Sequence, residues 1–493
     1  MAVQMQENSD QNILHDNNFK NAVAGIQKRA ERQLDYSKLT NIYVQTDLFI
    51  RTRSTENQLI LGRRGTGKTH MSSVFAHEIK LKGETVLYID CSKLGSGFWN
   101  VKGLSELTLG AKFFTVFLNQ ISTDLLDMVM RMENPEPSLQ DKICQKLNSL
   151  ATYINMNESI TDSSFNYRQI ADSLSQILKD LGIHRLFILV DEWAHIPIVA
   201  QPYFAEFIRR AIFPIPNISL KILAVNYQCD FYKILASEPI GIQLGADITD
   251  TIDLDSYFIY DVKKTQVVDF FGEVLYNHLA AELKWNIEIP TVDKLKSVES
   301  LFTQSGAFQE LVRASEGNCR DFLCIFSRAY FDGFLHSANA RKISIRNIES
   351  ASSAWFETSK RTNIKNELSV QKALNHVFEK VIKGYKSRTF MVQSEKSEHP
   401  VLMRLLNERI LHKLNILYSH KGKPGIRYEL FSLDYGAYVK FKGTEIEPYD
   451  LFWVENSQLD KLDENEAKFM VPFDDHRSIR RITFDPDTFS VET

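Results

Sequence analysis

The sequence predicts an α/β fold built on a parallel sheet, and three observations support this prediction. A glycine-rich segment at residues 62–69 separates a short apolar stretch (57–61) from a stretch of helical character (71–81). A second apolar run ends in two carboxylates within residues 186–192. Three further apolar stretches have the length and composition of strands: 85–90, 219–226 and 252–259. Because segments of helical pattern alternate with these strands, a parallel α/β sheet is expected.

The glycine-rich segment has the complete GxxxxGK[ST] pattern of a phosphate-binding loop. Its backbone N–H groups can converge on the β- and γ-phosphates of a nucleotide, and the N-terminus of the following helix adds a positive end. Lys68 supplies a mobile charge, and the Thr69 hydroxyl can reach Mg²⁺. The residues expected to bind the cofactor are the loop and its next neighbour: Gly62, Arg63, Arg64, Gly65, Thr66, Gly67, Lys68, Thr69 and His70.

The carboxylates at residues 191 and 192 supply the second half of a nucleotide site. A continuous apolar run such as Leu186 to Val190 is typical of a strand buried on both faces of a parallel sheet. We expect Asp191, with Thr69, to hold Mg²⁺ and Glu192 to polarise the attacking water. The reaction implied is Mg²⁺-dependent hydrolysis of a nucleoside triphosphate.

Length and composition restrict the remaining possibilities. A chain of 493 residues has room for two to four domains of roughly 100–200 residues each. No apolar run approaches 18 residues and the segment 4–18 is polar, so we expect a cytoplasmic protein without a membrane partner. The five cysteines are scattered and lack zinc-ligand spacing, so reduced, buried thiols are expected.

The net charge of −4 hides an uneven distribution. Residues 361–442 contain sixteen Lys and Arg against seven Asp and Glu, a net charge of +9. Residues 443–493 contain five against thirteen, a net charge of −8. This asymmetry predicts a basic module followed by an acidic tail that could fold back onto it.

The order of these pieces resembles the AAA+ ATPases, in particular the initiator branch typified by origin-recognition proteins. The resemblance covers about residues 40–440 by architecture and implies ATP as the nucleotide. It also implies that Asn226, after the fourth strand, senses the γ-phosphate. In Glu316-Gly317-Asn318-Cys319-Arg320-Asp321, the arginine looks like the second sensor of the family's helical lid, and residues 342–351 resemble the start of the lid's last helix.

This resemblance implies five parts, ending in the winged-helix domain that closes members of this branch. We expect a fold with a P-loop NTPase parallel sheet carrying a helical insert, then an α-helical lid and a C-terminal winged helix. The expected boundaries are an N-terminal extension (1–35), the AAA+ core (36–262, insert about 92–165), the lid (263–360), the winged helix (361–442) and the acidic tail (443–493).

The sequence departs from the family where an arginine finger is expected. AAA+ rings place this arginine between the fourth and fifth strands, but no arginine occurs from Ala211 through Val312. Arg209 or Arg210, Lys233, or another protein would have to supply the charge in a self-associated core. The related STAND signalling ATPases are an alternative, although their threonine–arginine sensor is not visible after the fourth strand.

The basic module offers a candidate DNA surface. In a winged helix, the recognition helix enters the major groove and the hairpin wing contacts the backbone. Arg404, Arg409 and Lys413 lie on the candidate helix at 400–414, and Lys421, Lys423 and Arg427 on the candidate wing. Flexible cations of this kind suit phosphate contacts on double-stranded DNA.

Two functions compete at this point. The first is an ATP-dependent switch that couples nucleotide state to DNA binding and partner recruitment, in replication initiation, mobile-element control or anti-phage defence. The second is a STAND-like signalling or scaffold ATPase whose winged helix holds an effector protein. The helical insert suits partner recruitment in either case.

Overall fold

The structure is a computed structural model that divides into two compact units. It describes residues 13–26, 28–29, 36–95, 103–131, 141, 143–147, 165–260, 263–337, 339–419, 425–445 and 482–489. The sheet unit comprises Gln45–Gly62 and Lys68–Leu254. The helical unit comprises Met1–Val44, Arg63–Gly67 and Asp255–Thr493. The central five residues of the phosphate loop therefore group with the helical unit, and the loop's two ends group with the sheet unit.

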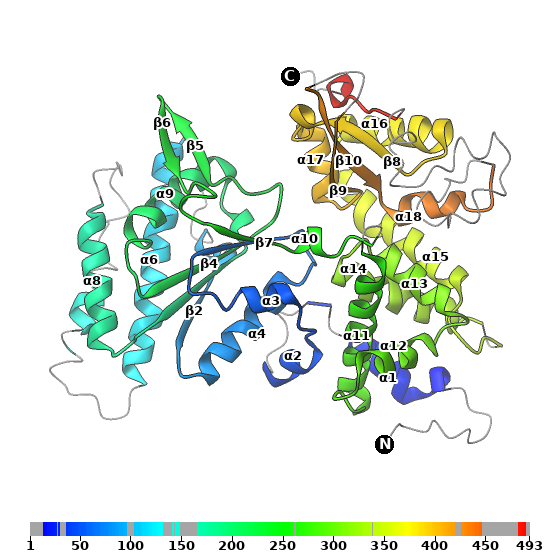
Figure 1. The fold of residues 1–493 in the computed structure, drawn as a ribbon, viewed down its shortest axis with the longest axis horizontal. Helices are drawn as coiled ribbons and strands as arrows, with labels where there is room; N and C mark the ends of the chain where they lie inside the picture. Colours follow the sequence, from blue (N-terminus) through cyan, green and yellow to red (C-terminus); the bar gives the residue numbers. More distant parts are fainter. Residues whose placement is uncertain are drawn as a thin grey trace. The chain divides into compact units, whose positions relative to one another are not determined.

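The sheet unit is built on five parallel strands in the order β2-β3-β4-β1-β7 (Figure 1). Its strands are β1 (Gln58–Leu61), β2 (Thr85–Asp90), β3 (Leu186–Asp191), β4 (Ile218–Ala224) and β7 (Asp250–Asp253). All seven residues of β4 and all six of β3 are buried, as continuous apolar strands in the middle of a parallel sheet should be. The predicted P-loop NTPase sheet is confirmed. The last strand ends earlier than the predicted 252–259.

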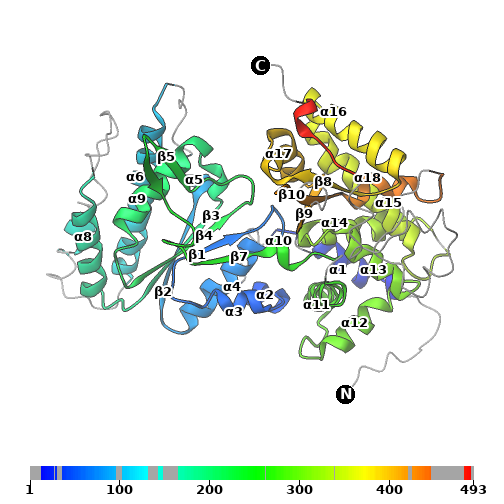
Figure 2. The ribbon, with the colours of Figure 1, turned by 45° about the horizontal axis from the view of Figure 1, so that its top comes forward.

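Helices cover both faces of this sheet (Figure 2). One face carries the long insert helix and two others: α6 (Glu106–Met130), α8 (Tyr167–Asp180) and α9 (Gln201–Ala211). The other face carries α4 (Lys68–Leu81), whose Phe75 ring meets the Phe187 ring edge-to-face at 5.4 Å. Since side chains alternate along a strand, Phe187 faces α4 while Leu186 and Ile188 belong to the core under α6.

Shorter elements complete the sheet unit. They are α3 (Asp47–Arg51), α5 (Cys91–Leu94), η4 (Trp193–His195), η5 (Ile198–Ala200) and the hairpin of β5 (Tyr232–Leu235) and β6 (Glu238–Gly241). The helix α6, which Ser105 caps, lies within the predicted helical insert at about 92–165. Much of the rest of this insert lies outside the described residues.

The first part of the helical unit is the predicted helical lid. Its helices are α10 (Leu254–Tyr257), α11 (Lys264–Leu283), α12 (Thr291–Glu299), α13 (Ser305–Ala314), α14 (Cys319–Arg328) and α15 (Ile345–Trp355), and the π-helical turns η6 (Ala329–Phe334) and η7 (Phe356–Lys360) extend the last two. A capping box formed by Ser344 and Asn347 starts α15 at the expected place.

The N-terminal segment packs within this helical unit. Its elements are η1 (Ile13–His15), α1 (Asn17–Gly25) and α2 (Tyr36–Ile42). The Tyr330 hydroxyl donates to the carbonyl oxygen of Leu14 at 2.5 Å, and Lys38 pairs with Glu282 at 2.5 Å. The helix α1 ends at residue 25, and its Phe19 ring packs against Tyr330 at 5.5 Å. The predicted N-terminal extension thus contributes to the core of the helical unit.

The C-terminal part of the helical unit combines helices with a small antiparallel sheet. Its helices are α16 (Leu368–His376), extended by η9 (Val377–Gly384), α17 (Pro400–Asn407) and α18 (Tyr435–Tyr438). The strands β8 (Thr389–Gln393), β9 (Leu411–Ser419) and β10 (Arg427–Leu433) lie in the order β8-β10-β9. Among the described residues, no helix is long and apolar enough to cross a bilayer.

Candidate nucleotide-binding site

The phosphate loop has the backbone geometry that its glycines predict. β1 ends at Leu61 and α4 begins at Lys68, so the loop runs directly into a helix N-terminus. Gly65 and Gly67 have φ of 95° and 100°, in the left-handed region that favours glycine. A β-carbon added at Gly67 would meet nothing within 4 Å, which is the open backbone that a phosphate needs.

Lys68 is held at the start of α4 with its side chain folded back onto the loop. Its residue is 8% exposed, and Nζ donates to the carbonyl oxygen of Gly62 at 2.6 Å. A phosphate oxygen carries charge and is therefore a stronger acceptor than a carbonyl. The ammonium group is thus buried close to the loop backbone, where a triphosphate can replace the carbonyl as its acceptor.

The loop and the carboxyl end of β3 meet through a hydrogen bond. Thr69 Oγ1 donates to Asp191 Oδ2 at 2.8 Å, and Asp191 is only 2% exposed. Hydroxyl and carboxylate oxygens are the ligands that Mg²⁺ prefers, so this donor set fits the expected metal. The predicted pairing of Thr69 with Asp191 has the required geometry.

Tyr88, on the neighbouring strand β2, is a member of this site that the sequence analysis missed. Its hydroxyl also donates to Asp191 Oδ2. Partial burial and the adjacent carboxylate both raise the pKa of Tyr88 well above its ordinary value, so the phenol stays protonated and remains a donor. The sequence contains a signal for this role, because Tyr88 has a polar hydroxyl and lies two positions before the end of β2, the strand beside β3.

Glu192 follows β3 in an unusual backbone conformation. Its φ of 56° and ψ of 37° are left-handed, which costs roughly 1 kcal/mol or more for a residue with a β-carbon. Its Oε2 lies 3.1 Å from His195 Nδ1. Buried Trp193 anchors the turn through Nε1, which donates to Gln201 Oε1 at 3.1 Å. The turn separates the two carboxylates, since Asp191 points into the interior and Glu192 stays half-exposed.

The remaining predicted residues of the sheet unit have other neighbours. Asn226 lies two positions beyond β4, and its Nδ2 approaches Asp253 Oδ1 at 3.4 Å. Arg209 and Arg210, the candidate fingers, both pair with buried Glu206, at 2.8 and 2.6 Å. Lys233 pairs with Glu106 at 2.6 Å and His70, on the first turn of α4, is partly buried.

Within the helical unit, the centre of the loop is bound by residues far along the chain. Arg63 donates through its backbone N–H and its Nε to the carboxylate of Asp255, at 2.9 and 3.1 Å. Its Nη2 donates to the carbonyl oxygen of Glu316 at 3.1 Å, and its Nη1 donates to His412 Nδ1. Arg63 is only 8% exposed, so its guanidinium connects the phosphate loop to the lid and to the C-terminal sheet.

The segment predicted to carry the second sensor also contacts the loop. Asn318 Nδ2 donates to the Arg64 carbonyl oxygen at 2.8 Å, while Asn318 Oδ1 caps α14. The backbone N–H of Arg320 donates to the Gly65 carbonyl oxygen at 3.0 Å. A β-carbon at Gly65 would lie 2.5 Å from Asn318 Oδ1, so only glycine permits this approach. The backbone of Arg320 therefore contacts the loop.

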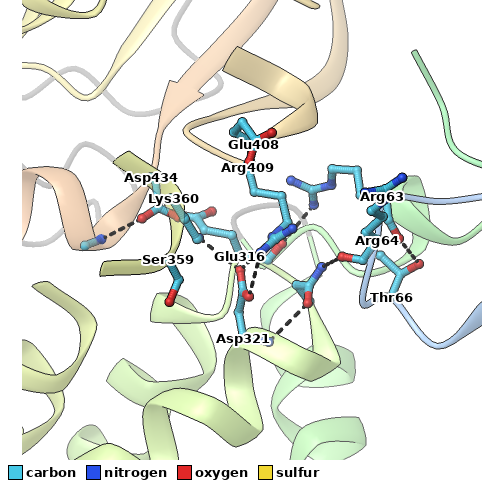
Figure 3. Close-up of polar contacts among 12 residues, drawn as sticks. Arg63, Arg64, Thr66, Glu316, Asp321, Ser359, Lys360, Glu408, Arg409 and Asp434 are labelled. Carbon is cyan, nitrogen blue, oxygen red and sulfur yellow. Dashed lines mark hydrogen bonds and ion pairs between the residues drawn. The ribbon is translucent and has the colours of Figure 1, made fainter. Parts of the chain in front are cut away.

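A buried chain of charges continues from Arg63 into the C-terminal part (Figure 3). His412 Nε2 lies 3.1 Å from Asp434 Oδ2, which lies 2.6 Å from Lys360 Nζ. Lys360 also lies 2.9 Å from Asp321, which pairs with Arg409 at 3.1 Å. Lys360, Asp321 and Asp434 are at most 2% exposed, so each charge depends on the others for compensation.

Hydrogen bonding fixes the protonation of His412 in this chain. Nδ1 accepts from Arg63, so the single ring proton lies on Nε2 and is donated to Asp434. Burial and the Arg63 charge lower the pKa of His412 to about 3, in agreement with a neutral ring. The cations Arg409 and Lys360 hold the pKa of Asp321 well below its ordinary value.

The predicted recognition helix is wrong beyond Asn407. α17 ends there, Arg409 turns the chain with a φ of 57°, and β9 begins at Leu411. The β-branched and aromatic side chains that follow suit a strand, and the buried pair with Asp321 takes Arg409 away from any surface.

Three of the six predicted DNA-contacting cations, Arg404, Arg409 and Lys413, are paired within the helical unit. Arg404 bonds to Glu367 and Glu408, and Lys413 pairs with Glu429 at 2.6 Å. Arg427 is exposed at the start of β10. Lys421 and Lys423 lie outside the described residues.

No protein-family model and no curated protein matches this chain. Similar solved structures include two variants of RuvB from Thermotoga maritima, at 12% and 11% identity, covering 81% and 80% of this chain and 90% of theirs, each with a TM-score of 0.32. The Aeropyrum pernix Orc1 protein in complex with DNA is 11% identical over 86% of this chain and 96% of that chain, with a TM-score of 0.30. Overlaps this limited carry no functional inference.

Proposed function

We propose that this chain is an AAA+ type ATPase that binds and hydrolyses ATP and uses its nucleotide state to control its C-terminal part. The hydrogen bond from Thr69 to Asp191 carries this proposal, because it joins the end of the phosphate loop to the buried carboxylate at the end of β3. A glycine-rich turn alone has no need of that carboxylate. Together they form the two halves of a site for a triphosphate and its metal.

Each predicted residue has a role in this proposal. Lys68 binds the β- and γ-phosphates, and Thr69 and Asp191 hold Mg²⁺, which would neutralise charge developing on the phosphates. Glu192 orients and polarises the attacking water. Asn226 and Arg320 sense the γ-phosphate. Arg209 or Arg210 would act on a neighbouring copy, which requires release from Glu206 and self-association of the core.

The contacts of the loop centre provide a route for control. Arg63 binds lid residues and His412 on β9, while Asn318 and Arg320 bind the Arg64 and Gly65 carbonyls. A phosphate that reorganises this backbone changes the bonds that the lid makes to it. The C-terminal part then experiences nucleotide binding through a continuous set of hydrogen bonds.

Two substitutions test the ATPase. Lys68→Ala is expected to weaken binding of a fluorescent ATP analogue by at least 100-fold. Lys80→Ala, exposed on the last turn of the same helix, should leave binding unchanged. Glu192→Gln should retain ATP binding and slow hydrolysis by about 10²–10³-fold. Loss of binding in Glu192→Gln would contradict the assignment of the two carboxylates.

The pairing of the basic residues favours an effector protein as a second candidate ligand of the C-terminal part. Arg404, Arg409 and Lys413 bind carboxylates of the same unit, so a DNA grip would rest on Lys421, Lys423 and Arg427. Reversal of these three to glutamate should weaken retention of double-stranded DNA at low salt at least tenfold if DNA is the ligand. Unchanged retention would leave the effector protein as the ligand.

A further inference from the structure

The edge of the C-terminal sheet is occupied by the chain's own tail. Among the strands that the structure describes, β8 lies at the edge of this sheet, in the order β8-β10-β9. Met391 N donates to the Ile482 carbonyl oxygen, and Phe484 N donates to the Met391 carbonyl oxygen, both at 2.8 Å. These bonds set Thr483 opposite Met391 as a parallel bridge. The tail thus binds in the way that an added strand binds an exposed sheet edge.

An aromatic slot beside this edge holds two phenylalanines of the tail. Phe484 is 4% exposed, with its ring centroid 5.4 Å from Phe390 and 5.8 Å from His376. Phe489 stacks on Phe484 at 5.6 Å and lies 5.1 Å from His376. Phe484 is buried and Phe489 is partly buried, so both rings contribute apolar area to this contact.

A cation at the end of the same edge binds the acidic residues between the two rings. Lys396 Nζ lies 2.8 Å from Asp485 and 2.5 Å from Asp487. Edge strand, slot and lysine therefore recognise one pattern, an extended segment with an apolar residue, a phenylalanine two positions later and acidic residues after it. The tail carries this pattern as Ile482, Phe484, Asp485 and Asp487.

The tail is tethered by a long connection. Residues 446–481 separate the last described residue before it from Ile482. The described contact of the tail with β8 consists of two backbone hydrogen bonds, the packing of its rings and exposed ion pairs. A free segment of the same pattern can make the same contacts and therefore compete with the tail.

We propose that the β8 edge, the slot formed by His376 and Phe390, and Lys396 form a docking site for an extended segment of another protein. That segment has the pattern apolar–x–Phe–acidic, and the chain's own tail occupies the site until it is displaced. This inference is independent of nucleotide hydrolysis and assigns a surface for partner recruitment.

The test uses the full-length chain and a fluorescein-labelled peptide with the sequence of residues 480–490. The wild-type chain should bind the peptide weakly, because its own tail competes. Phe484→Ala in the chain weakens that competitor and should tighten peptide binding at least tenfold by fluorescence anisotropy. Adding Lys396→Glu should abolish the gain, whereas Lys383→Glu, which changes an exposed lysine paired with Glu379, should not.

A second variant avoids the buried ring. Asp485→Asn with Asp487→Asn removes only exposed charges from the tail and should still tighten peptide binding, by about threefold. Equal affinities for wild type and both tail variants would overturn the proposal. A wild-type mass that doubles with concentration, lost in Phe484→Ala, would assign the site to the tail of a second copy and would also overturn it.

Discussion

The two ends of the phosphate loop and its centre are held in different ways. Gly62, Lys68 and Thr69 make their contacts within the sheet unit, to a loop carbonyl and to the end of a strand. The centre binds residues of the helical unit, and from Arg63 the bonds continue to Asp255 and His412. The ends use contacts that suit the proposed nucleotide chemistry, while the centre is bound by residues of the lid and of the C-terminal sheet.

The two parts of the loop also differ in the number of charged side chains buried beside them. At the ends, a single carboxylate, Asp191, is buried beside neutral hydroxyl donors. From the centre, a buried chain runs from Arg63 through neutral His412 to the charges of Asp434, Lys360, Asp321 and Arg409. Removing a charged member leaves its partners uncompensated. The stability of the protein should therefore be sensitive to single substitutions among these buried charged residues.

The largest loss of stability is expected from substitution of Lys360, which lies between Asp321 and Asp434. Lys360→Met keeps the apolar stem and removes the charge, leaving two buried carboxylates short of a cation. We expect a loss of about 3–5 kcal/mol in the free energy of unfolding, measured with urea. Lys365→Ala, an exposed neighbour, should change it by less than about 0.5 kcal/mol. A change in the free energy of unfolding below about 0.5 kcal/mol for both variants would contradict the mutual dependence of these buried charges.

Substitution of Arg63 tests whether the phosphate loop is linked to β9 through its guanidinium. Arg63→Ala should cost about 2 kcal/mol, because Asp255 and His412 lose a charged donor, whereas Arg64→Ala, with an exposed side chain, should be nearly neutral. In wild type, ATP should change amide hydrogen exchange in β9. Arg63→Ala should bind ATP within about threefold of wild type and lose that change. A response retained in the variant would show that the nucleotide reaches β9 by another route.

The ends of the loop could be predicted from the sequence, whereas the contacts of its centre could not. The loop, Lys68, Thr69 and Asp191 follow from local pattern, because a strand, a glycine turn and a helix fix their geometry within a few residues. The lid helices were predictable because their apolar periodicity and caps are local. The first residues of β9, 411–414, were mistaken for the end of a helix because the apolar run after Pro400 has no break in pattern at Arg409.

The buried charges could not be predicted for a different reason. Arg63 and His412 are 349 positions apart, and neither has a neighbour in sequence that marks it as buried. Arg409 and Lys413 were predicted to be surface cations, since basic residues are rarely buried unless paired. Their carboxylate partners lie on other elements, so the net charge of +9 over residues 361–442 overstated the cations available to DNA.

The pH dependence of stability gives a finer test of the buried chain. Because the pKa of His412 is lowered to about 3, the unfolded chain binds a proton below about pH 6.5 that the folded chain does not. Stability should therefore fall as pH falls from 6.5 toward 3, by at most about 1.4 kcal/mol per pH unit from this group. His412→Gln should flatten the melting temperature between pH 6.5 and 5, whereas the exposed His336→Gln should not. An unchanged slope would mean that His412 is protonated in the folded state.

The smallest effect is expected at Tyr88, on the sheet side of the comparison. Its hydroxyl and that of Thr69 donate to the same oxygen of Asp191, so the phenol competes with a metal for that oxygen. Tyr88→Phe should change the free energy of unfolding by about 1 kcal/mol or less and strengthen Mg²⁺ binding in the presence of ATP by up to about fivefold. A magnesium titration of the fluorescent ATP complex measures this, with Tyr232→Phe on the exposed hairpin as control. If Tyr88→Phe weakens Mg²⁺ binding instead, the Tyr88 hydroxyl positions Asp191 for the metal. Metal binding at the ends of the loop would then depend on a neighbouring side chain, as the position of the loop centre depends on residues of the helical unit.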